Sequence, residues 1–145
     1  MSSPTGDRSW EIEFDEEFHR EFVRLSIEVQ DQLLGHAGLL QRFGPTLGRP
    51  TVDTLNGSKH RNMKELRFDA ANGAWRVAFA FDPRRRAILL VAGDKSGHAE
   101  KAFYKKLITA ADIRYGRHME TLAAGDEVRS NAQTKGAAKH RKSKR

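Results

Sequence analysis

The N-terminal part of the chain changes its hydrophobic period once. Residues 10–14 alternate apolar and acidic side chains, which is the two-residue period of a half-buried strand. Further on, the apolar positions recur every three to four residues, and this spacing predicts amphipathic helices over 15–25 and 27–43. Asp15 and Ser26 stand where the N-caps of these helices would lie. The pattern therefore predicts one strand followed by two antiparallel helices.

Three further strands are predicted after a loop. The Gly44-Pro45 pair ends the helical pattern, and residues 45–62 are rich in Gly, Pro, Thr and Asn. The pairs Asn72-Gly73 and Asp82-Pro83 are typical of tight turns between strands. The predicted strands are Met63–Phe68, the alternating segment Ala74–Phe81, and the continuously apolar segment Ala87–Ala92.

The rest of the chain predicts one helix and a polar tail. Apolar residues return at helical spacing over 98–120. Residues 125–145 are basic and poor in apolar side chains, so we expect them to be disordered, as we do residues 1–9. One folded domain is expected over 10–124. Its order, β-α-α-β-β-β-α, predicts an α+β fold with a mostly antiparallel four-stranded sheet, an N-terminal helical hairpin, a C-terminal helix, and all helices on one face.

Charge is distributed unevenly over this expected fold. The formal net charge is +7, and the segment 128–145 holds seven Lys and Arg side chains and no Asp or Glu. Within the body, residues 1–40 hold nine acidic and three basic side chains, whereas residues 41–127 hold ten acidic and sixteen basic. Such a layout fits anion binding by the strand-rich half, although an unevenly charged solvated surface would look the same.

Composition excludes several kinds of function. The chain has no cysteine, so it has no thiolate nucleophile, disulfide or thiolate metal site. Its six histidines show no paired ligand spacing, and residues 93–97 lack the spacing of a phosphate-binding loop, so neither a metal nor a small-molecule cofactor is expected. No segment has the length of a membrane span or the core of a signal peptide. We therefore expect a soluble, cytoplasmic protein that does not bind membranes.

Several short segments, taken in order, resemble one family. They are Lys64–Arg67, Gly73–Val77, the turn Gly93–Lys95 and the helix Glu100–Leu107. Together they resemble the RelE/ParE superfamily of toxins, and within it the HigB-like (phage Gp49-like) branch of type II toxin–antitoxin systems, over about residues 10–120. The resemblance implies a compact RelE-like sheet with a helical hairpin on one side and a concave basic face on the other. It also implies a toxin that binds the ribosome and cuts mRNA there, and that a cognate helix-turn-helix antitoxin neutralises.

Two arginines are the leading candidates for such chemistry. Metal-independent RNA cleavage requires deprotonation of the 2′-OH, stabilisation of charge on the phosphate and protonation of the 5′-oxygen. Arg67 and Arg76 stand on adjacent predicted strands, on the face opposite their core-facing neighbours, so both should reach an uncovered face and could grip one phosphate. Glu65 shares that face. It could act as a general base, orient the arginines, or form an ordinary surface ion pair with them.

The resemblance places further candidates around the turn after the last strand. It implies that Arg76 stabilises the phosphate and that Lys95 is a basic catalytic residue of this turn. His98 could protonate the leaving group, because histidine is the side chain that most readily exchanges a proton near neutral pH, or could simply be an exposed first-turn residue. Tyr104 could stack on a base or be partly buried packing. Lys101, one turn earlier, belongs to the same candidate RNA-binding surface.

A basic cluster precedes the first sheet arginine. Lys59, His60, Arg61 and Lys64 fit contacts to phosphates along RNA. The chain departs from better-known relatives in having Met63 and Glu65 where they have paired lysines, and in lacking a terminal tyrosine. Two alternatives to a ribosome-dependent endoribonuclease therefore stay open. One is a non-enzymatic toxin of the same fold that binds a protein such as DNA gyrase, and the other is a basic nucleic-acid-binding module.

Overall fold

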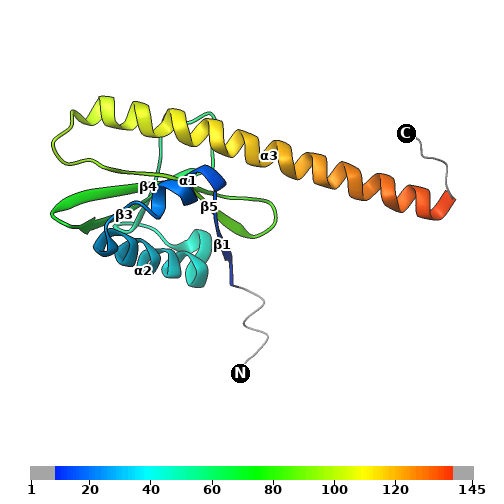
Figure 1. Cartoon of the computed structure of the whole chain (residues 1–145), viewed down its shortest axis with the longest axis horizontal. Coiled ribbons are helices and arrows are strands. Elements are labelled where there is room, and N and C mark those ends of the chain that lie inside the picture. Colours follow the sequence, from blue (N-terminus) through cyan, green and yellow to red (C-terminus); the bar gives the residue numbers. More distant parts are fainter. Residues whose placement is uncertain (1–8, 139–145) are drawn as a thin grey trace, which may run out of the picture. The chain divides into compact units, whose positions relative to one another are not determined.

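The computed structural model describes residues 9–138, with side chains described as far as residue 126. The chain divides into two compact units, Met1–Tyr115 and Gly116–Arg145. Within the described residues, five strands form one sheet in the order β1-β5-β4-β3-β2. These strands are β1 (Glu11–Phe14), β2 (Val52–Thr54), β3 (Met63–Ala70), β4 (Gly73–Phe81) and β5 (Arg86–Asp94). The helices are α1 (Glu16–Phe22), α2 (Ile27–Phe43) and α3 (Glu100–Ala138), with a short 3-10 helix at Gly44–Thr46 (Figure 1).

The N-terminal helical hairpin confirms the prediction. Asp15 caps α1 by accepting a hydrogen bond from the backbone N–H of Phe18 at 3.0 Å, and Ser26 caps α2 by accepting from Val29 at 3.3 Å. Gly44 ends α2 with a φ of 57°, a conformation that favours glycine. A Cβ at this position would also meet the Trp10 ring. The residues that the sequence marks as caps and terminators therefore act as such.

The sheet is mostly antiparallel, as predicted, but it has one more strand. β1 pairs in parallel with β5, and the remaining neighbours pair antiparallel. The predicted count of four strands is wrong because β2, inside the expected loop 45–62, pairs with β3 through Val52, Asp53 and Thr54. Three residues are too few to show the hydrophobic alternation of a strand. This segment is a strand because it pairs with β3, which the local sequence does not indicate.

The connection between β3 and β4 lies one residue earlier than predicted. Ala71 and Asn72 have positive φ angles of 50° and 62°, and Ala70 pairs with Gly73 across the ladder. These two residues therefore form the two-residue turn, rather than Asn72-Gly73. Gly73 is the first strand residue, where an added Cβ would come within 2.5 Å of the Asp94 carboxylate.

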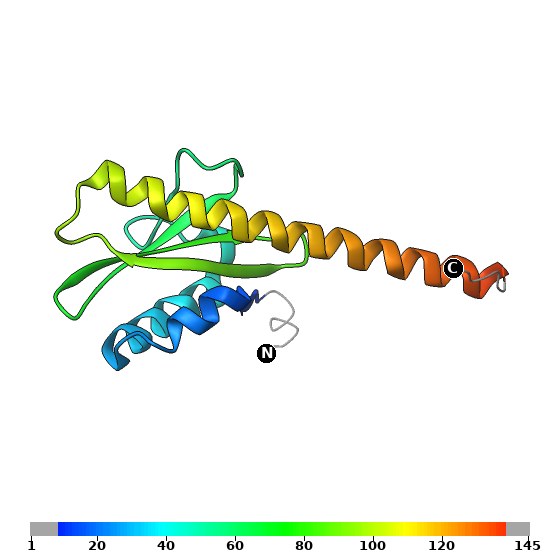
Figure 2. The same cartoon turned by 45° about the horizontal axis from the view of Figure 1, so that its top comes forward.

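The prediction that all helices lie on one face is wrong. Side chains of α1 and α2 pack on one face of the sheet, here called the hairpin face, which includes Leu66, Val77, Phe79 and Leu89. The first part of α3, residues 100–115, packs on the other face (Figures 1 and 2). A Cβ at Gly93 would come within 2.9 Å of the Phe103 ring. This second face, here called the α3 face, includes Met63, Glu65, Arg67, Arg76, Ala78, Ala80 and Gly93.

Helix α3 runs past its predicted end near residue 120 and continues to Ala138. Residues 125–138, which composition predicts to be disordered, are helical in the structure. Low apolar content argues against burial in a core, whereas the helix depends on its own backbone hydrogen bonds and on residues such as Ala, Glu and Arg that favour them. The predicted leader up to residue 8 and the tail from 139 lie outside the described residues. No helix in the described part of the chain combines the length and apolarity that crossing a membrane requires.

Candidate functional site

The two predicted arginines are neighbours in the sheet. Arg67 of β3 and Arg76 of β4 are cross-strand partners, so their side chains leave the same face, the α3 face. Glu65 points to this face too, two residues before Arg67. The register that the sequence predicts for these three side chains is therefore confirmed, and it places two arginines and one glutamate on the same face of neighbouring strands.

The expectation that both arginines emerge on an uncovered face is wrong for Arg76. Its side chain is only 9% exposed, because α3 lies over this part of the sheet. Its Nη1 donates to the carbonyl of Trp75 at 2.9 Å, and its Nε lies 3.8 Å from Oε1 of Glu65 without forming a hydrogen bond. Glu65, which is equally buried, thus forms a buried rather than a surface ion pair with this arginine.

Tyr104 of α3 completes this cluster. Its hydroxyl donates a hydrogen bond of 2.7 Å to Oε1 of Glu65. Burial raises the pKa of Tyr104, the hydrogen bond to Glu65 raises it further, and the cation of Arg76 acts in the opposite direction. The phenol therefore stays protonated at neutral pH and remains a donor to the carboxylate. Of the two predictions for Tyr104, partial burial is what the free chain shows.

Arg67 forms the solvent-facing side of the cluster. Its side chain is 33% exposed, and its Nη1 lies 3.8 Å from Oδ2 of Asp53 on β2. Asp53 also pairs with Arg49 at 3.3 Å. A hydrogen bond from the backbone N–H of Thr54 holds the pKa of Asp53 below its usual value, and the two arginines contribute to the same shift. Arg67 is therefore a partly neutralised cation in reach of solvent.

Lys95 stands at the turn between β5 and α3, as the sequence predicts. Its Nζ lies 5.9 Å from the centre of the Tyr104 ring and 3.3 Å from Oε1 of Glu100. The turn is ordered by Asp94, whose carboxylate accepts from the backbone N–H groups of Ala74 at 3.1 Å and Ser96 at 2.9 Å. Burial alone would raise the pKa of Asp94, but these hydrogen bonds and the Ser96 hydroxyl outweigh it and lower the pKa.

The structure brings together five of the predicted residues and separates the others. Glu65, Arg67, Arg76, Lys95 and Tyr104 are here called the arginine cluster. Lys64 alternates with Glu65 and therefore lies on the hairpin face. Lys101 is exposed on the turn of α3 that precedes Tyr104.

The basic loop lies farther along α3. The backbone N–H of Lys59 donates to Asp112 at 3.0 Å, and the His60 ring lies edge-on to Tyr115 with centroids 5.0 Å apart. Since an α-helix rises about 1.5 Å per residue, these contacts lie about 12–16 Å beyond Tyr104 along the helix. Lys59, His60 and Arg61 are therefore not part of the arginine cluster. They could contact only another part of a long RNA.

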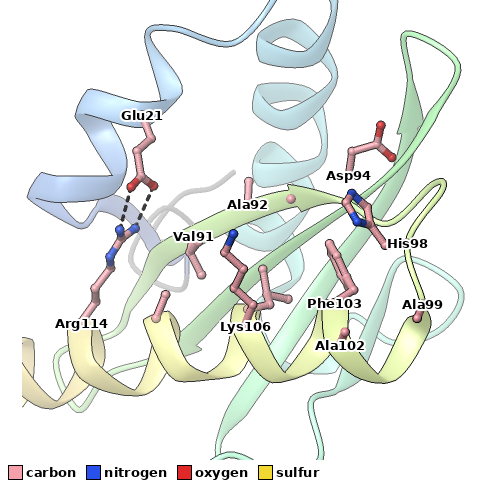
Figure 3. A pocket seen from close by; sticks show the side chains of 13 residues that line it. Glu21, Val91, Ala92, Asp94, His98, Ala99, Ala102, Phe103, Lys106 and Arg114 are labelled. Atoms are coloured by element: carbon pink, nitrogen blue, oxygen red, sulfur yellow. Dashed lines mark hydrogen bonds and ion pairs between the residues drawn. The ribbon is translucent and has the colours of Figure 1, made fainter.

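His98 faces a different feature, a groove between β5 and α3. The groove measures about 610 Å³, and its lining includes the apolar side chains of Val91, Phe103 and Leu107. His98 and Asp94 stand at one end, and an ion pair between Arg114 and Glu21 closes the other end (Figure 3). The backbone N–H of His98 donates to the Lys95 carbonyl at 3.3 Å, and its ring lies 6.2 Å from that of Phe103, so a part for the imidazole in the reaction stays a prediction.

Arg114 is a side chain with several structural contacts that the sequence did not single out. Its Nη1 donates to the Leu90 carbonyl at 2.8 Å and to Glu21 at 2.9 Å, and its Nη2 donates to Glu21 at 2.7 Å. Leu90 is buried and has no partner in either ladder of β5, because the register with β4 shifts between Ala78 and Phe79 and β1 ends opposite Leu89, so Arg114 supplies a donor to its carbonyl. One arginine thereby ties α3 to the sheet edge and to α1. A lone arginine at a helical position gives no sign of this in the sequence.

Asp53 and Asp94 were also missed. Asp53 lay in a segment expected to be a loop, and nothing local marks it. Asp94 did carry a recognisable pattern, since an Asp before Lys-Ser-Gly at a strand end is typical of side chains that accept from nearby backbone N–H groups. Among the described residues, no three His, Asp or Glu side chains are grouped so that they could hold a metal ion.

Known proteins are similar to this chain in sequence, and others are similar to it in fold. The family described as phage-derived protein Gp49-like (DUF891) matches residues 20–116. A Mycobacterium tuberculosis protein named putative toxin HigB3 is 47% identical over 95 residues, which cover 66% of this chain and 81% of that protein. Putative toxin HigB2 of the same organism is 42% identical over 96 residues, but the match spans only 47% of its length.

The fold has a solved counterpart. The free Escherichia coli toxin RelE, solved as a double arginine-to-alanine mutant, matches with a TM-score of 0.51 at 12% identity, over 70% of this chain and 95% of that one. At this identity the match concerns the fold alone. It agrees with the sheet and helices described above. By sequence, the chain belongs to the phage-derived Gp49-like family, together with proteins named putative HigB toxins, and its fold is similar to that of RelE.

Proposed function

We propose that this protein is the toxin of a toxin–antitoxin system and that it arrests growth by cutting mRNA on the ribosome without a metal ion. Relatives named putative HigB toxins support the first statement. The observation that carries the second is the cross-strand pair Arg67–Arg76 with Glu65 beside it. Two guanidinium groups and a carboxylate on one sheet face supply the cations and the base that RNA cleavage requires.

The proposed reaction assigns one role to each group. Glu65 takes the proton of the 2′-OH, whose oxygen attacks phosphorus and forms a 2′,3′-cyclic phosphate. The bond from phosphorus to the 5′-oxygen breaks, and Lys95 gives its proton to that oxygen. Arg67 and Arg76 stabilise the charge that develops on the phosphate oxygens. His98 has no part in this scheme, because it faces the groove.

The same proposal implies two kinds of partner, an antitoxin and RNA. A cognate antitoxin, expected to be a helix-turn-helix protein, would neutralise the toxin. The exposed cation Lys101 would contact ribosomal RNA or mRNA near the arginine cluster, and the exposed cations Lys59 and Arg61 would contact another part of a long RNA. We expect such contacts to weaken as salt rises. Coexpression of the protein encoded beside this gene should restore growth.

Substitution of Arg76 tests the proposed cleavage reaction directly. We expect Arg76→Ala to lower mRNA cleavage on programmed ribosomes by roughly two to three orders of magnitude, because it removes a cation that stabilises the transition state. Arg76→Lys keeps the charge but loses the planar fork, so it should retain part of the activity. Arg24→Ala, which removes an exposed arginine next to α1, is the matched control and should cleave as the wild type does. Thermal melts should show all three variants folded.

The outcomes separate the alternatives. Equal cleavage by wild type and Arg76→Ala would remove Arg76 from the reaction. Growth arrest without RNA cleavage would instead favour a toxin that binds a protein target such as DNA gyrase. RNA binding with neither cleavage nor growth arrest would favour a nucleic-acid-binding module.

A further inference from the structure

Arg76 is a buried cation that uses only part of its hydrogen-bonding capacity. Its side chain is 9% exposed, and Nη1 is engaged by the Trp75 carbonyl. Nε is buried, 3.8 Å from Glu65, and makes no hydrogen bond. Buried donors normally have partners, so such an atom indicates a place for an acceptor. An anion that reached this point would complete the coordination of the guanidinium.

Tyr104 binds the same Glu65 oxygen that lies 3.8 Å from Nε of Arg76. Its hydroxyl holds Glu65 at 2.7 Å, so the carboxylate that pairs with Arg76 is itself occupied. Phe103, with ring centroids 5.2 Å away, and Lys95, whose Nζ is 5.9 Å from the ring centre, flank the Tyr104 ring. Arg67 on the next strand remains 33% exposed. Of two adjacent arginines, one is thus open to solvent and the other lies behind a tyrosine.

The start of α3 is less buried than the turns that follow it. Residues 96–102 are exposed, and Gly97 adopts a φ of 76° in open space, where an added Cβ would meet no atom within 4 Å. The buried residues of α3 begin later, at Leu107, and continue with Ala111 and Tyr115. Rotation of the Tyr104 side chain, or fraying of the first helical turn, would therefore uncover Glu65 and Arg76 while the anchored turns stay in place.

We propose that Tyr104 is a gate over an anion pocket formed by Arg76 and Arg67. In the closed state its hydroxyl binds Glu65, and in the open state a phosphate group takes its place against the two guanidinium groups. That the phosphate belongs to an RNA chain rests on the proposed function. The gate itself rests on the burial and contacts of Arg76, Glu65 and Tyr104.

Chemical modification of arginine tests the gate without any RNA. Phenylglyoxal would be applied to the wild type, Tyr104→Phe and Tyr104→Ala, and the rate at each arginine followed by mass spectrometry. In the wild type Arg76 should react more slowly than Arg67. Tyr104→Phe loses one hydrogen bond and should speed the reaction of Arg76 about fivefold. Tyr104→Ala should speed it further, and inorganic phosphate should then protect Arg76, while Arg24 serves as the unchanged reference.

Several results would overturn the gate. One is an unchanged rate at Arg76 in both variants. Another is weaker binding of a non-cleavable 2′-deoxy oligonucleotide to Tyr104→Ala with the same Arg76 rate, which would make Tyr104 a base-stacking contact. If Tyr104→Ala does not fold, Tyr104→Phe decides alone, because it keeps the ring. If Arg76 is modified faster in the Tyr104 variants but the protein cleaves no RNA, the gate is supported and the proposed reaction is wrong. If the protein cleaves RNA but the modification rate of Arg76 does not respond to the variants, the reaction is supported and the gate is wrong.

Discussion

Glu65 and Arg76 form a buried ion pair whose presence the stability of the fold does not explain well. A buried ion pair contributes little net stability, because desolvation offsets much of the attraction, and apolar residues of similar size would often serve the fold as well. Here the pair is also imperfect, since Nε of Arg76 has no hydrogen bond and Tyr104 competes for the same carboxylate oxygen. Such an arrangement makes better sense as a site that rearranges than as a device that stabilises the sheet.

Glu65→Gln should separate the role in the reaction from the role in the fold. The amide oxygen can still accept from Tyr104, but it cannot take a proton from the 2′-OH, so we expect cleavage to fall roughly 10²–10⁴-fold. Loss of the anion beside Arg76 should also lower the free energy of unfolding by about 1–3 kcal/mol. Cleavage rates at a temperature where the variant is fully folded, together with urea titrations, measure both effects.

Asp53→Asn is the control for this variant. It removes a carboxylate from the same face of the sheet, next to Arg67, but from a solvent-exposed pair of small energetic value. We expect little change in stability and a cleavage rate within a few fold of the wild type. A Glu65→Gln protein that cleaves at the wild-type rate would show that Glu65 is a structural partner of Arg76 and not the base.

The turn between β5 and α3 places both Lys95 and Tyr104. Asp94 holds it to β4 by accepting from Ala74 as well as from Ser96. Gly73 leaves the space that the carboxylate fills. This carboxylate therefore helps to order the turn that leads into the helix of the gate residue.

Asp94→Asn should change how stability depends on pH. The pKa of Asp94 in the folded protein lies below its usual value of 3.8. Its contribution is therefore fully present above pH 3.8 and is lost as the pH falls through the lower, folded pKa. The variant should be less stable than the wild type at pH 7, and this difference should shrink between pH 4 and pH 2. Urea midpoints across this range, with exposed Asp31→Asn as the control, provide the measurement. A difference that stays constant with pH would contradict the ion's role.

Regular elements were predictable from periodicity, whereas their layers were not. The caps at Asp15 and Ser26 and the alternation in β4 depend on a few neighbouring residues, so the sequence shows them directly. Which face α3 covers depends on tertiary packing. One indication was nevertheless present: beyond Arg76, the second face of β4 carries Ala78 and Ala80, which are fully buried. Consecutive alanines on one strand face suit a face under a helix better than a face open to water.

For the candidate site too, the features set by local sequence were predictable and those set by tertiary packing were not. Strand register alone placed Arg67, Arg76 and Glu65 on one face, because that conclusion needs only the two-residue period and the hairpin. Arg114 and the burial of Arg76 could not be predicted, since both depend on where a helix distant in sequence comes to lie. Loop candidates such as His60 were assigned by proximity in sequence, and contacts with Asp112 and Tyr115 place that loop elsewhere.

At the scale of the whole molecule, the excess of positive charge is concentrated where apolar residues are scarce. Residues 128–145 carry seven Lys and Arg side chains, and their apolar side chains are one valine and three alanines. Burial of so little apolar surface cannot contribute much to folding. Cations at this density attract RNA at long range and add affinity that is not specific for sequence.

Truncation after Glu127 tests this division of roles. The shortened protein should melt within about 2 °C of the full chain, because residues 128–145 bring almost no apolar surface to a core. Its binding to ribosomes should be weaker at low salt and should depend less steeply on salt, since each cation that contacts a phosphate adds roughly 0.7–0.9 to the slope. Melting curves and binding measured from 50 to 300 mM salt give both values. A fall of many degrees in the melting temperature would mean that this segment packs on the folded body, and an unchanged salt slope would mean that its charges do not meet RNA.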